Sequence, residues 1–275
     1  MRANTASIFA RGSATIDFCE PNYVHSTSIA EWWGTWSAMA MVLLGGAGMV
    51  LGVYHGLKAK HIALWLHLTI TGAGTMYLHA TLAFFGQACD EVPMVITVLS
   101  LFYCAVTAED LLSSTSSAAL ALGLTAMGVW ACDTSLRTKY MLDADAVEPM
   151  VFPIIFGALM CLLIVQEFRL YWNYAARRLR RLYEYAAVTF VLGFGVWVVD
   201  QRACSSVQAW QLHAWWHVLT ALSAHFTFIW VVAIDAQVHG GGLPHSLLES
   251  GLAVWYYGLG SRSWGSASAD APKRE

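Results

Sequence analysis

Residues 203–234 read ACSSVQAWQLHAWWHVLTALSAHFTFIWVVAI. This stretch contains no Asp, Glu, Lys or Arg, and it is longer than the roughly 20 residues that a helix needs to cross a bilayer. A charge at the bilayer centre costs about 2.5–3.5 kcal/mol on insertion scales, so a long charge-free stretch indicates a membrane span. The stretch therefore predicts a membrane-spanning helix, and this helix carries His213, His217 and His225.

The composition of the whole chain agrees with a membrane protein. Of its 275 residues, 57% are hydrophobic and 12% are charged, whereas an average soluble domain has about 25% charged residues. Thirteen Trp and eleven Tyr suit the aromatic belts at the two membrane interfaces. The net charge of −3 offers no surface for a polyanion, so we expect no nucleic-acid partner. We also expect no obligate protein partner.

Seven charge-free windows lie along the chain and predict seven spans. They run between Glu31 and Lys58, Lys60 and Asp90, Glu91 and Glu109, Asp110 and Asp133, Glu148 and Glu167, Glu184 and Asp200, and Arg202 and Asp235. The sixth window, Tyr185 to Val199, is short for a span, and interfacial residues beside it are expected to extend it. We predict an all-α polytopic bundle of seven transmembrane helices. Residues 1–31 would form a luminal segment, 32–236 the membrane catalytic domain, and 237–275 a mobile cytosolic tail.

The distribution of basic residues predicts the orientation of the bundle. When the seven spans alternate across the membrane, one side collects most of the basic residues: Lys58, Lys60, Arg169, Arg177, Arg178, Arg180, Arg181, Arg262, Lys273 and Arg274. The positive-inside rule places this side in the cytosol. The N-terminus is then luminal and the C-terminus cytosolic, as in an integral protein of the endoplasmic reticulum or Golgi.

Three histidines are predicted to lie at one depth, near the luminal side. His79 is near the end of the second span, while His213 and His217 are near the start of the seventh, which runs in the opposite direction. The last two are four residues apart, so they project from one helix face about one turn apart. Three neutral histidines with one open position form a typical catalytic zinc site. The alternative is a set of structural histidines satisfied within the bundle.

The other histidines are interpreted differently. His225 lies about 12 Å deeper than His217 on a helix, which favours a packing or channel role. Five further histidines fall in loops or at interfaces and are expected to be solvated: His25, His55, His61, His239 and His245.

Two polar residues are candidates for catalysis beside the histidines. Thr75 is one helical turn before His79, although a threonine in a helix often bonds its own i−4 carbonyl instead. Asp90 is predicted at the start of the third span, where it is either a helix-start carboxylate or a group that exchanges protons with a metal-bound water. Its expected proximity to three histidines favours the catalytic interpretation.

A group of oxygen-bearing side chains precedes the first span on the same predicted side. Asp17, Glu20, Asn22 and Glu31 are hard ligands that suit calcium, but the EF-hand spacing is absent and a solvated acidic segment is equally consistent. Cys19 and Cys204 both fall in predicted luminal segments, where an oxidising environment would allow them to pair.

Several motifs resemble the alkaline ceramidases and occur in the order found in that family. The matching stretches are DFCEPNY at 17–23, IAEWW at 29–33, GTMYLH at 74–79, CDEVPM at 89–94, WVVDQRAC at 197–204 and HAWWH at 213–217. They span most of the chain, from about Asp17 to Ile234. Such ordered agreement is specific.

The resemblance implies an intramembrane zinc amidohydrolase that cleaves ceramide, dihydroceramide or phytoceramide into a sphingoid base and a fatty acid. It implies that His79, His213 and His217 hold zinc, that Asp90 handles the proton, and that Thr75 assists at the oxyanion. It further implies a regulatory calcium ion bound by Asp17, Glu20, Asn22, Glu31 and the Phe18 carbonyl. The implied disulfide joins Cys19 and Cys204.

The chain departs from the family at two positions. Thr75 replaces the usual serine, and Gly34 stands where relatives often carry asparagine. The alternative function is a seven-helix lipid receptor of the adiponectin and progestin receptor type, in which zinc would be structural. Asp90 and the acidic group between Asp17 and Glu31 favour the ceramidase.

Overall fold

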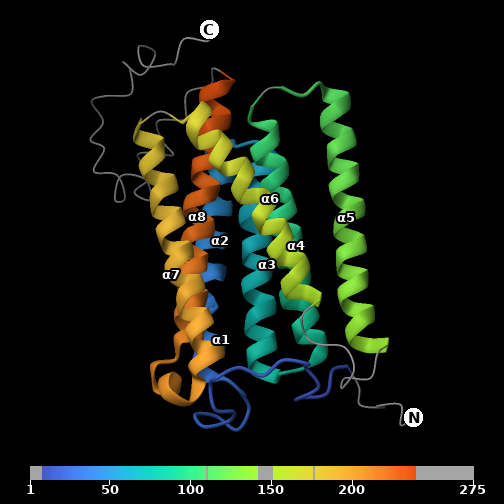
Figure 1. Ribbon diagram of the computed structural model, residues 1–275, viewed down its shortest axis with the longest axis vertical. Coiled ribbons are helices and arrows are strands. Elements are labelled where there is room, and N and C mark those ends of the chain that lie inside the picture. Colours follow the sequence, from blue (N-terminus) through green and yellow to red (C-terminus); the bar gives the residue numbers. More distant parts are fainter. Residues whose placement is uncertain (1–7, 110, 142–150, 176, 240–275) are drawn as a thin grey trace.

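The computed structural model describes residues 8–109, 111–141, 151–175 and 177–239, and within these residues the fold is a bundle of long helices without strands (Figure 1). The helices are α1 (Trp32–Ser37), α2 (Met39–Tyr54), α3 (Ala59–Thr81), α4 (Phe84–Thr107), α5 (Ser114–Met141), α6 (Val151–Asn173), α7 (Arg177–Val207) and α8 (Leu212–Val238), with a 3-10 turn, η1 (Gln208–Trp210), between the last two. The tail from residue 240 on lies outside the described residues. The all-α polytopic fold predicted from the sequence is confirmed.

Six spans in the described part of the chain are long and apolar enough to cross a membrane; one of them combines α1 and α2, and the others belong to α4, α5, α6, α7 and α8. The helix α3 does not meet this criterion, although it has 23 residues and packs between α2 and α4. The hydropathy of α3 is lower than that of the six spans for a physical reason. Polar residues of α3, among them His61, Thr71, Thr75 and His79, are buried inside the protein and not exposed to lipid.

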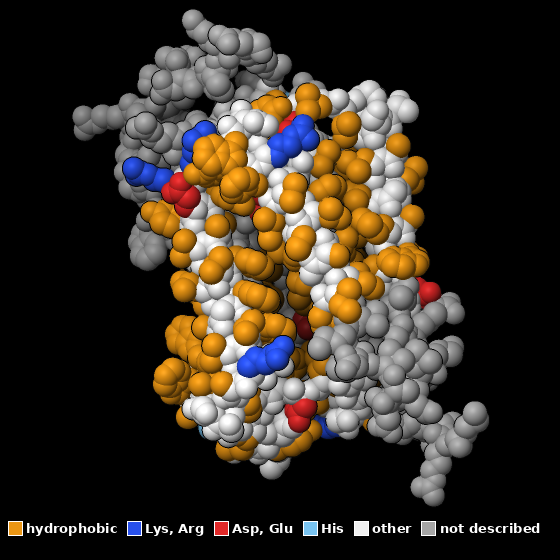
Figure 2. Space-filling model, in the orientation of Figure 1, with side chains coloured by type: hydrophobic (Ala, Val, Ile, Leu, Met, Phe, Trp, Pro, Cys, Tyr) orange, Lys and Arg blue, Asp and Glu red, His pale blue; other side chains and the backbone are white. Residues whose placement is uncertain are grey.

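The core of the bundle lies around α8. Large side chains near its C-terminal half, such as Phe228, Trp230 and Ile234, are fully buried, whereas α7 exposes Val188, Val191 and other apolar side chains. Figure 2 shows hydrophobic side chains over most of the visible face between the two ends, with one group of charged side chains near the upper end and several more towards the lower end. This pattern fits a bundle whose outer helices contact lipid.

Glycines bring α2 and α3 into close contact. Gly45, Gly48 and Gly52 are buried on α2. A methyl group added at Gly45 would lie 2.7 Å from the Thr69 backbone nitrogen and 2.8 Å from the Trp65 carbonyl oxygen, and one added at Gly48 would overlap the Trp65 ring. These glycines therefore let the backbones of α2 and α3 approach closely.

Both ends of α7 differ from those predicted. The sixth span was predicted to lie between Glu184 and Asp200. The helix α7 runs instead from Arg177 to Val207 and includes both of these residues and Arg202. A charged side chain does not end a helix when it reaches the membrane interface or is buried against protein. Asp200 is buried in this way.

At one end of the bundle, here called the lysine end, a buried carboxylate of α8 joins this helix to the start of α3. Asp235 of α8 accepts hydrogen bonds from Lys58 Nζ at 2.5 Å and from Lys60 Nζ at 2.8 Å. His61 Nε2 lies 3.9 Å from the same carboxylate, and His61 is buried. The expectation that His61 is solvated was wrong, because α3 turns this ring towards α8 and away from water.

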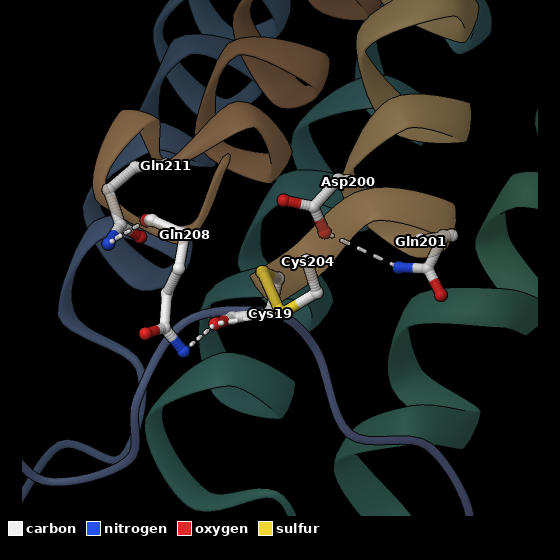
Figure 3. The surroundings of a disulfide bond; sticks show 6 residues. All are labelled: Cys19, Asp200, Gln201, Cys204, Gln208 and Gln211. Carbon is white, nitrogen blue, oxygen red and sulfur yellow. Dashed lines mark hydrogen bonds between the residues drawn. A yellow bond between two sulfur atoms is a disulfide. The ribbon is translucent and has the colours of Figure 1, made fainter. Parts of the chain in front are cut away.

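The opposite end, here called the histidine end, is covered by the N-terminal segment. Backbone hydrogen bonds join Ala14 to Leu82 and Glu31 to His79 across the end of α3. A disulfide joins Cys19 to Cys204 at the C-terminal part of α7, with the two Cα atoms 5.4 Å apart, and the Gln208 side chain donates to the Cys19 carbonyl at 3.0 Å (Figure 3). The predicted pairing of these cysteines is present.

Gly45 and Gly46 offer a matched test of the α2–α3 contact. We expect Gly45→Ala to lower the melting temperature by several degrees, because the added methyl group meets backbone atoms of α3 and overpacking costs about 1–3 kcal/mol. Gly46→Ala meets no atom within 4 Å and should leave the melting temperature unchanged or raise it slightly. Tryptophan fluorescence during heating in detergent measures both, and equal shifts would contradict the packing described.

Candidate metal centre

His79 of α3 and His213 and His217 of α8 gather in one buried cluster at the histidine end. One ligand nitrogen from each ring lies within 4.8 Å of the others. The ring centroids are 5.1 Å apart for His79 and His213, 4.9 Å for His79 and His217, and 4.7 Å for the α8 pair. The predicted coincidence in depth of the three histidines is therefore confirmed. Histidine nitrogens at this spacing suit zinc or another transition metal.

Two of the three rings have an outer hydrogen-bond partner. His79 Nδ1 is 2.6 Å from Glu31 Oε2, and His217 Nδ1 is 2.8 Å from Ser37 Oγ. His213 Nδ1 is buried without a partner. Metal-binding histidines usually donate their second ring N–H to a carboxylate or another acceptor, which fixes the tautomer. The contacts of His79 and His217 have this form, and no sequence pattern indicated the contact of Ser37.

Glu31 lies between the N-terminal segment and the cluster and is fully buried. Its Oε1 atom has no hydrogen-bond partner. Burial, followed by the charge of Asp17, raises the pKa of the Glu31 carboxyl to about 8. A cation nearby would lower this pKa and satisfy the unpartnered oxygen.

The predicted calcium ligands are only partly brought together. Asn22 Nδ2 donates to Asp17 Oδ1 at 3.2 Å, and both residues are exposed, whereas Glu20 and Glu31 are buried. In the described part of the chain, the three histidines are the one group of three or more His, Cys, Asp or Glu side chains that gathers closely enough to hold a metal. The carboxylates therefore do not form a second compact cluster in this structure.

Glu20 has a structural role that the sequence did not indicate. Its Oε1 accepts the Trp33 N–H and its Oε2 accepts the Gly34 N–H, both at 2.8 Å. These are N–H groups of the first turn of α1, which have no partner within the helix. Glu31, the residue before α1, makes no side-chain cap, so Glu20 caps this helix from a distance of 13 residues in the chain.

Asp90 and Thr75 are in direct contact across α3 and α4. The Thr75 hydroxyl bonds Asp90 Oδ1 and also lies 2.8 Å from the Thr71 carbonyl oxygen. The Thr75 hydroxyl is therefore placed to bond either its own i−4 carbonyl or Asp90, as the two interpretations predicted. Its single proton serves one of these acceptors at a time. Gly74 permits this contact, because a side chain there would collide with the Cys89 carbonyl.

The predicted position of Asp90 at a helix start was wrong. The helix α4 begins at Phe84, so Asp90 lies inside it, almost two turns from the first residue. Charge-free windows missed this boundary because Phe84, Phe85 and their neighbours belong to α4 and not to the preceding span. A helix-start role for the Asp90 carboxylate is excluded, and its catalytic role stays a prediction.

Two further residues shape the space around the histidines. The ring of Phe18 packs against His79 and His213, with centroid distances of 4.6 and 4.2 Å, whereas the sequence pointed only to the Phe18 carbonyl. Gly34 faces His79 so closely that a Cβ atom would lie 2.5 Å from His79 Nδ1. Gly34, which stands where relatives often carry asparagine, therefore lies at a position that has no room for a side chain.

Comparisons with known proteins identify the family of this chain. The family model "Ceramidase" matches residues 10–248. The chain is 29% identical to alkaline ceramidase 3 of Mus musculus over 226 residues, which are 78% of this chain and 80% of that relative. It is 27% identical to a putative alkaline ceramidase of Dictyostelium discoideum, covering 86% of this chain and 92% of the relative. It is 25% identical to an alkaline ceramidase of Arabidopsis thaliana, covering 90% and 98%.

The family match includes all three histidines, Asp90 and both cysteines of the disulfide. It favours the hydrolase over the lipid-receptor alternative. The chain therefore belongs to the alkaline ceramidase family, whose members are hydrolases.

Proposed function

We propose that this protein is a zinc-dependent amidohydrolase that cleaves the amide bond of ceramide within the membrane. The observation that carries the proposal is the buried cluster of His79, His213 and His217 in a chain of the alkaline ceramidase family. The products would be a sphingoid base and a free fatty acid. The choice among ceramide, dihydroceramide and phytoceramide is left to assay.

The donor set fits zinc. Three imidazoles are buried together, and the Nδ1 atoms of His79 and His217 have outer partners, which leaves Nε2 of each ring to bind a metal. When bound, zinc would polarise the amide carbonyl and lower the pKa of a water molecule. Three histidine ligands with one open position are typical of catalytic zinc sites.

Asp90 would move the proton in this reaction. Its carboxylate accepts a proton from the attacking water as the new C–O bond forms, and it delivers this proton to the amine nitrogen as the C–N bond breaks. The Thr75 hydroxyl, which contacts Asp90, holds the carboxylate before this transfer. Once Asp90 is protonated, the Thr75 proton is free to stabilise the oxyanion.

The surroundings of the site suit a lipid substrate. Helices of the bundle expose apolar side chains on their outer faces, which suits a ceramide molecule that stays in the bilayer. We propose that the histidine end is luminal and that the lysine end is cytosolic, in the endoplasmic reticulum or Golgi. The support is the concentration of basic residues on one side of the threaded chain.

We further propose that calcium binds between the N-terminal segment and the cluster. The donors would be Asp17, Glu20, Asn22, Glu31 and the Phe18 carbonyl, a set of oxygens that calcium prefers. Support comes from the buried Glu31 Oε1, which has no hydrogen-bond partner. Because Glu31 also contacts His79, calcium would brace the ring that holds zinc.

Asp90→Asn tests the proton-transfer step. We expect ceramide hydrolysis to fall about 10²- to 10⁴-fold while bound zinc stays at the wild-type level, because Asp90 is not part of the histidine cluster. His217→Ala should lose both zinc and activity. Fatty-acid release from ceramide and metal analysis of the detergent-purified protein measure these results.

The matched control is Glu91→Gln, which removes the neighbouring buried carboxylate of α4 that bonds Gln87. It should retain activity and zinc. Wild-type hydrolysis by Asp90→Asn would refute the role given to Asp90, and wild-type hydrolysis by His217→Ala would refute the metal mechanism.

Asp17→Asn tests the calcium site without disturbing α1, because Asp17 is exposed whereas Glu20 caps that helix. We expect calcium to raise the melting temperature of the wild type, and this shift should be largely lost in Asp17→Asn. Glu184→Gln, a change at an exposed carboxylate bonded to Tyr171, should keep it. The calcium proposal fails if Asp17→Asn shows the wild-type shift at each calcium concentration.

A further inference from the structure

Ser37 is the last residue of α1 and joins this short helix to the cluster. Its Oγ lies 2.8 Å from His217 Nδ1 on α8 and 3.1 Å from the carbonyl oxygen of Gly34. The two residues are 180 positions apart in the chain. The contact with His217 therefore exists only because α1 packs against α8 at the histidine end.

The direction of these hydrogen bonds follows from their chemistry. A carbonyl oxygen only accepts, so Ser37 donates its single hydroxyl proton to Gly34. The Ser37 oxygen is then an acceptor towards His217, and Nδ1 of that ring must carry the proton. A neutral imidazole with Nδ1–H has its lone pair on Nε2. The chain runs from the His217 N–H to Ser37 and from the Ser37 O–H to Gly34.

We propose that Ser37 is a positioning residue that holds His217 in the tautomer able to bind zinc through Nε2. This inference rests on the proposed zinc site and adds a residue to it. Glu31 would do the same for His79 beside a bound metal, with its carboxylate accepting from His79 Nδ1, which lies 2.6 Å away. The two partners lie at opposite ends of α1: Glu31 is the residue before its start, and Ser37 is its last residue.

The effect of Ser37 is expected on metal affinity more than on stability. Without the hydroxyl, His217 would lose its one side-chain hydrogen-bond partner and keep only the Gly34 backbone carbonyl. The ring could then rotate or change tautomer, and both changes weaken a metal bond. Outer partners of metal-binding histidines typically contribute about 10- to 100-fold in affinity. A serine that only ended the helix would affect melting temperature alone.

Competition with a zinc chelator measures the role of Ser37. We expect Ser37→Ala to bind zinc about 10- to 100-fold more weakly than the wild type, and Ser37→Thr, which keeps the hydroxyl, to restore affinity to within a few-fold. Ser223→Ala is the matched control, because Ser223 is a buried serine of α8 that donates to the Ala186 carbonyl at 2.9 Å. It should leave zinc affinity unchanged. The absorption spectrum of the cobalt-substituted protein should change in Ser37→Ala alone.

Each result separates this inference from the proposed function. Wild-type zinc affinity in a folded Ser37→Ala protein would overturn the role of Ser37 and leave the zinc site standing. Stoichiometric zinc without ceramide hydrolysis would overturn the proposed function and leave the role of Ser37 standing. A wild-type protein that binds no zinc would overturn both. If Ser37→Ala does not fold, Ser37→Cys, with a weaker acceptor of similar size, replaces it in the same comparison.

Discussion

The buried contact between Glu31 and His79 is the interaction on which the histidine end depends. A polar group away from water is costly unless it is paired, and both of these side chains are almost completely buried. Their contact joins the N-terminal segment to α3, and the backbone bond from Glu31 N–H to the His79 carbonyl reinforces it. The cap that Glu20 provides and the disulfide at Cys19 hold the same segment in place.

The two ends of the bundle meet the same constraint in different ways. At the lysine end, each oxygen of Asp235 accepts from a lysine ammonium group, so the carboxylate is neutralised by the protein itself. At the histidine end, Glu31 Oε1 and His213 Nδ1 remain unpartnered beside the cluster. Isolated unpartnered atoms such as His225 Nε2 also occur deeper in the bundle. Only the histidine end combines them with three gathered ligands among the described residues, which is why chemistry is expected there.

The sequence predicted the features that the membrane itself selects. Charge-free windows located the long helices, and the four-residue spacing of His213 and His217 located the α8 half of the cluster. The windows failed at α4 and α7 because Asp90, Glu184 and Asp200 lie inside helices, where protein contacts or the interface accommodate their charge. The burial of His61 and the contact of Ser37 with His217 depend on how distant helices pack, and no local pattern carries that information.

The geometry around His79 explains why a glycine occupies position 34. Glu31 must reach His79 from one end of α1 while Ser37 reaches His217 from the other, so the middle of this helix has to lie against the His79 ring. A Cβ atom at Gly34 would be 2.5 Å from Nδ1 of that ring. Phe18 packs on the ring as well. The ring is thus held by a hydrogen bond and by packing contacts, and a site held in this way would bind a metal without first having to reorganise.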